Sequence, residues 1–350
     1  MEKSLLFIGT YNVPLTTGDG DIFLGNGKGL YTLEFDNSLG EFGAQLYCVD
    51  SPNVSYIKPL PDESSILAVN ELENQESLVS KFSYDLQGKL LLTHRARTLG
   101  SASCHLEINS NNDTIFVSNY LSGNLTVLNN MELTQLIEHK GSSINIKRQD
   151  GPHVHSSLLY NNDQNLLVAD LGADALVSYS INSVNNKLTE DYRIDCKKGA
   201  GPRTIIKNKS GSNVYVANEL NCTISVFKVQ DHLLTEFQNI SVFEERPDFN
   251  GTTSELEFGK DGKYLYAATR GNNILSVFQV DKDGGCLKLI QTVSTFGDNP
   301  RSFCIISDYD WLIVANQDSE NLTCFKINMD GTLSMHTTCA FPTPVCIRTI

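Results

Sequence analysis

A short phrase that recurs along the chain limits its fold more than any other feature. Its six clear copies are LAVNE, FVSNY, LVADL, YVANE, YAATR and IVANQ, and their fourth residues are Asn70, Asn119, Asp170, Asn218, Thr269 and Asn316. These positions lie 49, 51, 48, 51 and 47 residues apart. An earlier copy, FIGTY, has Thr10 at this position, and the glycine-rich stretch TTGDGDIFLGNGKG accounts for its longer interval of 60 residues. A period near 50 indicates a repeat architecture.

Each repeat has the pattern of four short strands. From Pro202, PRTIIKN is followed by a turn, NVYVANE, a second turn, TISVFKV and a weaker segment near HLLTEFQNI. Four such strands cannot bury both faces alone, whereas units stacked around an axis share a continuous core. Helical repeats of similar period are the alternative, but no 3.6-residue apolar stripe survives a turn signal. We therefore expect an all-β fold, a β-propeller with four-stranded blades.

The two ends of the chain predict how the ring closes. The C-terminal TPVCIRTI is similar to NPRSFCII, the opening strand of a repeat, while the N-terminal SLLFIGTY matches a second strand. Pairing of these strands would complete a seventh blade and leave no open sheet edge. Seven blades of about fifty residues fill residues 1–350, so we expect a single seven-bladed domain.

Composition excludes several classes of partner and location. A net charge of −14 and an isoelectric point near 4.9, with no Lys/Arg run, argue against nucleic acid. The opening MEKSLLFIGTYNVP has four consecutive apolar residues and no cleavage signal, so we expect neither export nor a membrane span, and a cytoplasmic location. Nine cysteines without C-x-x-C spacing suit reduced thiols. Nothing in the sequence predicts the oligomeric state.

Two parts of each repeat, the start of the innermost strand and the end of the second strand, carry ionisable residues where apolar or small ones are expected. Fifteen residues before the reference position, where the innermost strand begins, stand Ser55, Cys104, His155, Arg203, Ser254 and Arg301. The next position holds Tyr56, His105, Ser156, Thr204, Glu255 and Ser302, and the position just after the reference holds Tyr11, Glu71, Tyr120, Leu171, Glu219, Arg270 and Gln317. Both sets should face one mouth of the central channel.

A funnel at that mouth would gather the charged members of these sets. We expect it to hold His155, Arg203, Glu219, Arg270 and Arg301, with His105, Glu71 and Glu255 nearby. Three arginines on an acidic protein predict a local anion site, and a histidine beside a glutamate can move a proton near neutral pH. The alternative is that arginine and glutamate form a structural ring of ion pairs between blades.

A metal site is the other interpretation of this region. His153 and His155, two residues apart on one strand, face the same side and could share an ion. No third ligand is identifiable from spacing, so we expect no metal and no other cofactor. His153 remains a candidate for substrate binding, and His155 is expected to line the channel.

These motifs together resemble a known family over the full length of the chain. They are GTYN, NVSY, CHLEI with VSNYLSGNLTV, GPHVHS with VADLGAD, GAGPR with VANELNCTISVF, SELEF with DGKYLYAATRGNN, and NPRSF with VANQDSENL. In this order they are similar to the lactonase family of seven-bladed β-propellers. That family includes propeller-type 6-phosphogluconolactonase and the fungal carboxy-muconate lactonising cyclase.

The resemblance implies a site at the channel mouth and an activity on lactones. The residues that match the family's motifs are His155, Arg203, Glu219 and Arg270. Two positions depart from the pattern. Thr204 stands where the family often has a histidine after GPR, and the fifth blade reads Glu255-Leu256-Glu257 where the family commonly has E-I-H.

The function expected on these grounds is hydrolysis of a sugar lactone, above all 6-phosphogluconolactone, in carbohydrate metabolism. His155 or Glu219 would be the general base, Arg203 would stabilise the oxyanion, and Arg270 and Arg301 would hold a phosphate or carboxylate. A muconate-type lactonising cyclase would use the same arginines. A non-catalytic propeller that binds partners through its rim is the alternative of another class.

Overall fold

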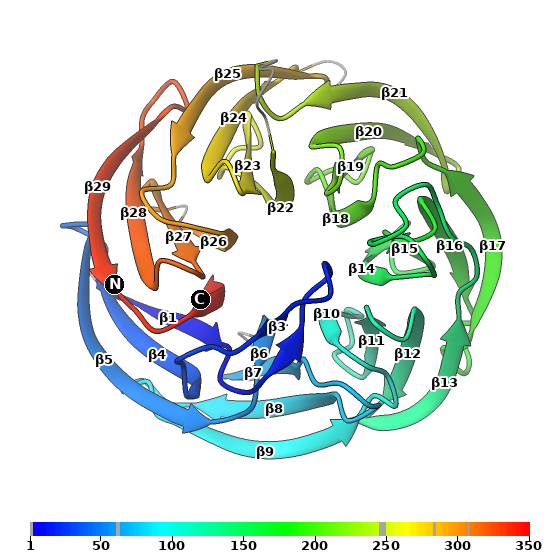
Figure 1. The fold of residues 1–350 in the computed structure, drawn as a ribbon, viewed down its shortest axis with the longest axis horizontal. Helices are drawn as coiled ribbons and strands as arrows, with labels where there is room; N and C mark the ends of the chain where they lie inside the picture. The colour runs from blue at the N-terminus through cyan, green and yellow to red at the C-terminus, as the bar shows by residue number, and fades with distance from the viewer. Residues whose placement is uncertain (1–2, 61–63, 245–249, 283–284, 307) are drawn as a thin grey trace.

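Seven four-stranded antiparallel sheets stand around a central channel (Figure 1). The structure is a computed structural model that describes residues 3–60, 64–244, 250–282, 285–306 and 308–350, and these residues include no α-helix. The described part of the chain therefore also offers no helix that could cross a bilayer. The predicted fold, an all-β seven-bladed propeller, is confirmed.

Six blades follow one another along the chain, each with its strands in sequence order from the channel outward. The first two are β6–β9 (Val54–Leu60, Ser65–Asn70, Leu78–Tyr84, Leu90–Arg97) and β10–β13 (Ser103–Ile108, Thr114–Asn119, Asn124–Asn129, Glu132–Glu138). The next two are β14–β17 (Val154–Tyr160, Asn165–Asp170, Ala175–Ile181, Leu188–Asp195) and β18–β21 (Pro202–Lys207, Asn213–Asn218, Thr223–Gln230, Leu233–Ser241). The last two are β22–β25 (Thr252–Phe258, Tyr264–Arg270, Ile274–Val280, Leu287–Ser294) and β26–β29 (Pro300–Ile306, Trp311–Asn316, Asn321–Ile327, Leu333–Ala340).

The seventh blade joins the two ends of the chain. Its strands, from the channel outward, are β30 (Pro344–Thr349), β1 (Lys3–Thr10), β4 (Gly29–Asp36) and β5 (Glu41–Asp50). β30 pairs with β1 in antiparallel register, with Leu6 opposite Thr349 and Ile8 opposite Ile347. Closure by the terminal strands, as predicted, leaves the second strand of this blade paired on both sides.

The core lies between adjacent blades. The second strands β7, β11, β15, β19 and β27 are buried throughout, whereas outer strands such as LTEDYRID of β17 are mostly exposed. One cluster between blades packs Leu6 and Ile8 of β1 against Ile313 of β27. Inner strands buried on both faces are rich in Val, Ile and Leu, and outer strands with one wet face alternate.

The recurring phrase serves this packing. The side-chain amide of Asn119 donates to Thr126 Oγ1 at 2.9 Å, that of Asn218 to Ser225 Oγ at 3.0 Å, and that of Asn316 to Thr323 Oγ1 at 3.1 Å. In each case the second strand ends in a buried amide that is bonded to the third strand. A buried amide needs such a partner, so the repeat position is explained by hydrogen bonding within the blade.

Every innermost strand carries a β-bulge near its start. In the third blade Val154 pairs with Asp170 and Ser156 with Ala169, so His155 is the extra residue. The same shift falls at Ser55, Cys104, Arg203, Ser254 or Glu255, Arg301 and Val345 in the other six blades. A bulge bends the strand and redirects a side chain, and here each redirected position borders the channel.

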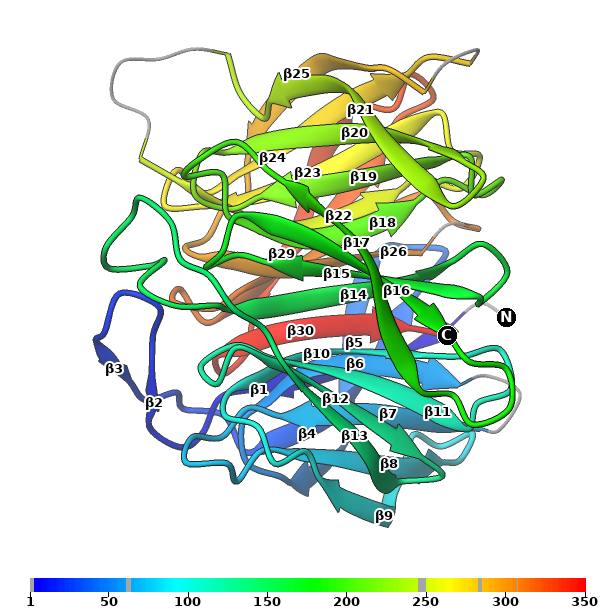
Figure 2. The ribbon, with the colours of Figure 1, turned by 90° about the vertical axis from the view of Figure 1, so that its right-hand side faces the viewer.

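A hairpin covers one end of the channel. Its strands, β2 (Leu15–Thr16) and β3 (Ile22–Phe23), extend from the seventh blade over the central opening (Figure 1). Seen from the side, the hairpin projects from the face opposite to the one where the two termini lie (Figure 2). This hairpin is part of the glycine-rich excursion that lengthens the first repeat.

Candidate functional site

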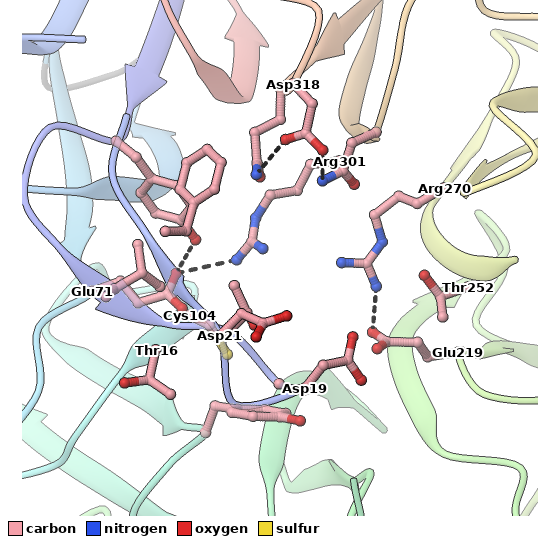
Figure 3. A pocket seen from close by; sticks show the side chains of 18 of the residues that line it. Thr16, Asp19, Asp21, Glu71, Cys104, Glu219, Thr252, Arg270, Arg301 and Asp318 are labelled. Atoms are coloured by element: carbon pink, nitrogen blue, oxygen red, sulfur yellow. Dashed lines mark hydrogen bonds and ion pairs between the residues drawn. The ribbon is translucent and has the colours of Figure 1, made fainter. Parts of the chain in front are cut away.

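A cavity of about 680 Å³ occupies the mouth of the channel beneath the β2–β3 hairpin (Figure 3). Residues that follow the second strands line it: Tyr11, Glu71, Tyr120, Glu219, Arg270 and Gln317. The bulge positions Cys104, His155 and Arg301 also line it, as do Asp19 and Asp21 of the hairpin and Arg148 of the loop before β14. The predicted funnel thus brings together His155, Glu219, Arg270, Arg301 and Glu71.

Glu219 is the centre of the charged groups on one side of this cavity. Its side chain is 2% exposed, and its Oε2 lies 2.8 Å from Arg270 Nη2 and 2.9 Å from Arg203 Nε. Arg148 Nη2 contacts the other carboxylate oxygen. Burial alone would raise the pKa of Glu219, but the charges of Arg270, Arg148 and Arg203 outweigh burial and hold that pKa well below its usual range. Glu219 is therefore a fixed negative charge.

A second ion pair stands on another side of the cavity. Arg301 Nη2 lies 3.1 Å from Glu71 Oε2, and Tyr11 Oη donates to the same oxygen at 2.6 Å. The Arg301 guanidinium lies over the Tyr11 ring, 5.2 Å from its centroid. Burial, followed by Glu71, raises the pKa of Tyr11, so its phenol stays a proton donor to Glu71.

His155 lies at the floor of the cavity. It is the bulge residue of β14, its ring stands edge-on to Tyr120 at 5.7 Å, and its backbone carbonyl accepts from Cys104 Sγ at 3.3 Å. Burial and then the positive charges of Arg203 and Arg301, partly offset by Glu219, hold the pKa of His155 well below 6.5. At neutral pH the imidazole is uncharged and can accept a proton.

The turn GAGPR explains how Arg203 and Glu219 are placed together. Gly201 has a φ of 64°, which favours glycine, and its N–H donates to Asp174 Oδ1 at 2.7 Å. Its carbonyl accepts the backbone N–H of Glu219 at 2.7 Å. One glycine therefore joins the start of β18, which carries Arg203, to the end of β19, which precedes Glu219.

Ion pairs between blades are also present, as the structural alternative predicted. Arg270 of β23 and Arg148 of the loop before β14 reach Glu219 from the blades on either side, and Arg301 of β26 reaches Glu71, which follows β7. The same contacts that join blades thus place guanidinium groups around a cavity. The ring of ion pairs between blades and the proposed anion site are therefore formed by the same arginines.

Three predicted site residues, Arg203, His105 and Glu255, line a different cavity and not the mouth. This second space of about 220 Å³ lies further along the channel and shares Cys104, His155 and Arg301 with the mouth. Arg348 lines it as well, and Arg348 Nη2 lies 3.2 Å from Glu255 Oε2. His105 follows the bulge residue Cys104 by one position, and Glu255 is the second of the two residues that fall in the register shift of its blade.

Glu257 gives this second cavity a group that titrates near neutrality. Burial raises the pKa of Glu257 to about 8. The charge of Arg348 opposes this shift, and the charge of Glu255 adds to it. Burial, assisted by Lys58 and Arg348, lowers the pKa of His105 well below 6.5. Both groups are therefore uncharged at pH 7.

His153 lies outside both cavities. Its ring stacks on Tyr120 at 4.5 Å, its Nδ1 lies 2.9 Å from the Tyr120 carbonyl oxygen, and its Nε2 lies 3.4 Å from Asp150 Oδ1. His153 thus stacks on the Tyr120 ring, whereas the ring of His155 is tilted edge-on to it. Across the residues that the structure describes, no group of three or more His, Cys, Asp or Glu side chains could hold a metal ion.

Sequence reasoning missed Arg148, Arg348 and the hairpin acids Asp19 and Asp21. Arg348 lies three residues after Val345, the bulge residue of the seventh blade. A comparison of equivalent positions in the repeats, which found the other site residues, could therefore have found it. Arg148 and the hairpin lie in loops of irregular length, where no equivalent exists in other repeats. For them the sequence carries no positional signal.

Comparisons with known proteins agree with this architecture. The family model described as Lactonase, 7-bladed beta-propeller matches residues 5–349. A 6-phosphogluconolactonase from Formosa agariphila is 30% identical over 319 residues, covering 87% of this chain and 90% of that protein, and one from Bacillus subtilis is 25% identical over 359 residues, covering 99% of each. The solved structure of a periplasmic gluconolactonase from Pseudomonas aeruginosa has a TM-score of 0.90 and 25% identity, covering 99% of each chain.

Proposed function

The chain belongs to the lactonase family of seven-bladed β-propellers and is a lactone-hydrolysing enzyme, and from that premise we propose that it opens 6-phosphogluconolactone to 6-phosphogluconate. One observation carries the choice of an anionic sugar lactone. Arg148, Arg203 and Arg270 surround Glu219, and His155, which is uncharged at neutral pH, lines the same mouth cavity as Glu219. The relatives named 6-phosphogluconolactonase support the same substrate. The proposal includes a cytoplasmic role in carbohydrate metabolism.

His155 is the general base in this proposal. It removes a proton from water while the water oxygen attacks the lactone carbonyl carbon, which creates a tetrahedral oxyanion. When the ring C–O bond breaks, the alkoxide that leaves takes the proton back from the imidazolium, and the product is an open-chain hydroxy acid. Glu219, which sequence reasoning left as the other candidate, is less suited to this role because its carboxylate oxygens are already paired with Arg148, Arg203 and Arg270.

The arginines supply positive charge where negative charge develops. Arg203 lies next to both His155 and Glu219, and burial followed by Arg270 lowers its pKa to about 10, which leaves it charged at neutral pH. We assign it to the oxyanion. Glu219 holds Arg203 and Arg270 in fixed positions, so the charge is in place before the reaction begins. Arg301 and Arg270 contact the remainder of the substrate.

The test is the rate of lactone opening by the purified protein. 6-Phosphogluconolactone is generated in the cuvette by oxidation of glucose 6-phosphate, and acid release is compared with the spontaneous reaction without protein. Acceleration in proportion to protein concentration is the expected result. A rate equal to the background for this lactone, with acceleration of unphosphorylated gluconolactone or of a muconolactone, would contradict the proposed substrate.

A further inference from the structure

Arg148 is an arginine of the mouth cavity that belongs to no repeat position. It lies in the loop between β13, which ends at Glu138, and β14, which begins at Val154. The loop is well anchored: Gln149 is fully buried and donates to the Leu171 carbonyl at 2.9 Å, while Ser143 Oγ donates to Asp174 Oδ2 at 2.5 Å. The Arg148 backbone N–H also donates to the Asn145 carbonyl at 3.1 Å. The fold therefore presents this side chain in a defined place.

The guanidinium of Arg148 joins three parts of the site. Nη2 contacts Glu219 and donates to Tyr120 Oη at 3.3 Å, and Nη1 lies 3.8 Å from Asp19 Oδ1 of the β2–β3 hairpin. The Arg148 side chain is 11% exposed, whereas that of Asp19 is 67% exposed. Nη2 is thus bonded to Glu219 and Tyr120, and Nη1 faces the exposed carboxylate of Asp19.

Charge is distributed unevenly across the cavity. On one side Arg301 and Glu71 form a pair with no net charge. Around Glu219, Arg148, Arg203 and Arg270 meet a single carboxylate, a local excess of two positive charges, while Asp19, Asp21, Asp298 and Asp318 add negative charges elsewhere in the cavity lining. Figure 3 shows Asp19 reaching from the hairpin toward Glu219 and Arg270 on this side. A phosphate monoester, with close to two negative charges, matches that excess.

We propose that Arg148, together with Arg270, binds the phosphate of the substrate, and that Asp19 occupies this place as a counter-ion until the phosphate displaces it. The inference rests on the proposed function. Arg270 offers a second guanidinium at the other oxygen of Glu219, with Nη2 committed to that oxygen, so the two arginines lie on either side of one carboxylate. Charge-assisted hydrogen bonds from a guanidinium to phosphate are strong and directional.

The experiment compares two substrates that differ only in the phosphate. Values of kcat/KM are measured for 6-phosphogluconolactone and for unphosphorylated gluconolactone with wild-type protein and Arg148→Met. The ratio of the two values should fall about tenfold or more in Arg148→Met, chiefly through KM for the phosphorylated lactone. Arg97→Met, an exposed arginine on the outer strand β9, is the matched control and should keep the wild-type ratio.

Asp19→Asn tests whether the Asp19 carboxylate competes with the substrate phosphate for Arg148. Asp19 is exposed, so this variant should fold as the wild type does, and its KM for the phosphorylated lactone should decrease. In the Arg148→Met background the same substitution should have no such effect, because the two residues act through one contact. An unchanged ratio in Arg148→Met, or an equal effect of Asp19→Asn in both backgrounds, would overturn the inference. Absence of all lactone opening in the wild type would instead refute the proposed function.

Discussion

At the residue scale, the environment of each titratable group separates roles that the sequence left open. His155 and Glu219 were equal candidates for the base, because both residue types can move a proton. Burial holds the pKa of His155 well below 6.5, so that it is neutral at pH 7, and three guanidinium groups hold the pKa of Glu219 well below its usual range, so that it is ionised at pH 7. Such assignments depend on neighbours from several blades, which a single strand pattern does not reveal.

Glu257 allows a prediction about stability and pH. Its pKa is about 8 in the folded protein and near 4.5 when unfolded, so its contribution to stability is fully present below pH 4.5 and is lost as pH rises to about 8. Glu257→Gln cannot ionise and should lose less stability over this interval. Chemical unfolding of both proteins at pH 5, 6.5 and 8.5 gives the difference directly. Two curves that stay parallel would mean that Glu257 is ionised in the folded state.

At the element scale, bulges decide which residues reach the mouth. The repeat comparison identified the position of His155, Arg203 and Arg301 because it recurs at a fixed distance from the reference residue. It did not separate that position from the next one, and so it placed His105 and Glu255 in the same funnel. The bulge residues Cys104, His155 and Arg301 line both cavities, whereas His105 and Glu255 line the second cavity alone.

Gly201 tests the link between turn geometry and the site. Gly201→Ala should lose about 1–2 kcal/mol of unfolding free energy for its left-handed backbone, and an added Cβ would also lie 2.6 Å from Leu220 Cγ. Gly211→Ala is the matched control, since Gly211 has a φ of 72° and open space around it. Denaturant unfolding should show a loss in both variants. Only Gly201→Ala should also lower kcat/KM, because Gly201 accepts the N–H of Glu219; equal activity of the two variants would contradict this.

At the scale of the whole molecule, the repeat period and the similarity of the chain ends to strands of a repeat were sufficient to predict the ring and its closure. Both signals can be read along the sequence, because the first is a spacing between repeats and the second is an incomplete repeat at each end of the chain. The hairpin over the mouth and the loop of Arg148 could not be predicted, because each occurs in one blade alone. Features that recur are accessible from sequence, and features that break the repeat require the structure.

Removal of β30 should open the ring. A variant that ends at residue 343 lacks the partner of β1, exposes Leu6 and Ile8, and should lose its cooperative thermal transition and form aggregates. Removal of Ile350 alone, which is exposed and lies beyond β30, is the control and should leave the transition temperature unchanged. Calorimetry and size-exclusion chromatography of the two variants provide the readout. A cooperative, monodisperse protein that ends at residue 343 would show that closure by the C-terminal strand is dispensable.

The central claim is that the mouth cavity opens a sugar lactone with His155 as base. The most direct measurement is the catalysed rate of 6-phosphogluconolactone opening, above the spontaneous rate, for wild type and His155→Gln at pH 7, with circular dichroism to verify the fold of each. A neutral base lost from a folded protein should lower kcat by about 100-fold or more. A folded His155→Gln variant with the wild-type rate would contradict the account.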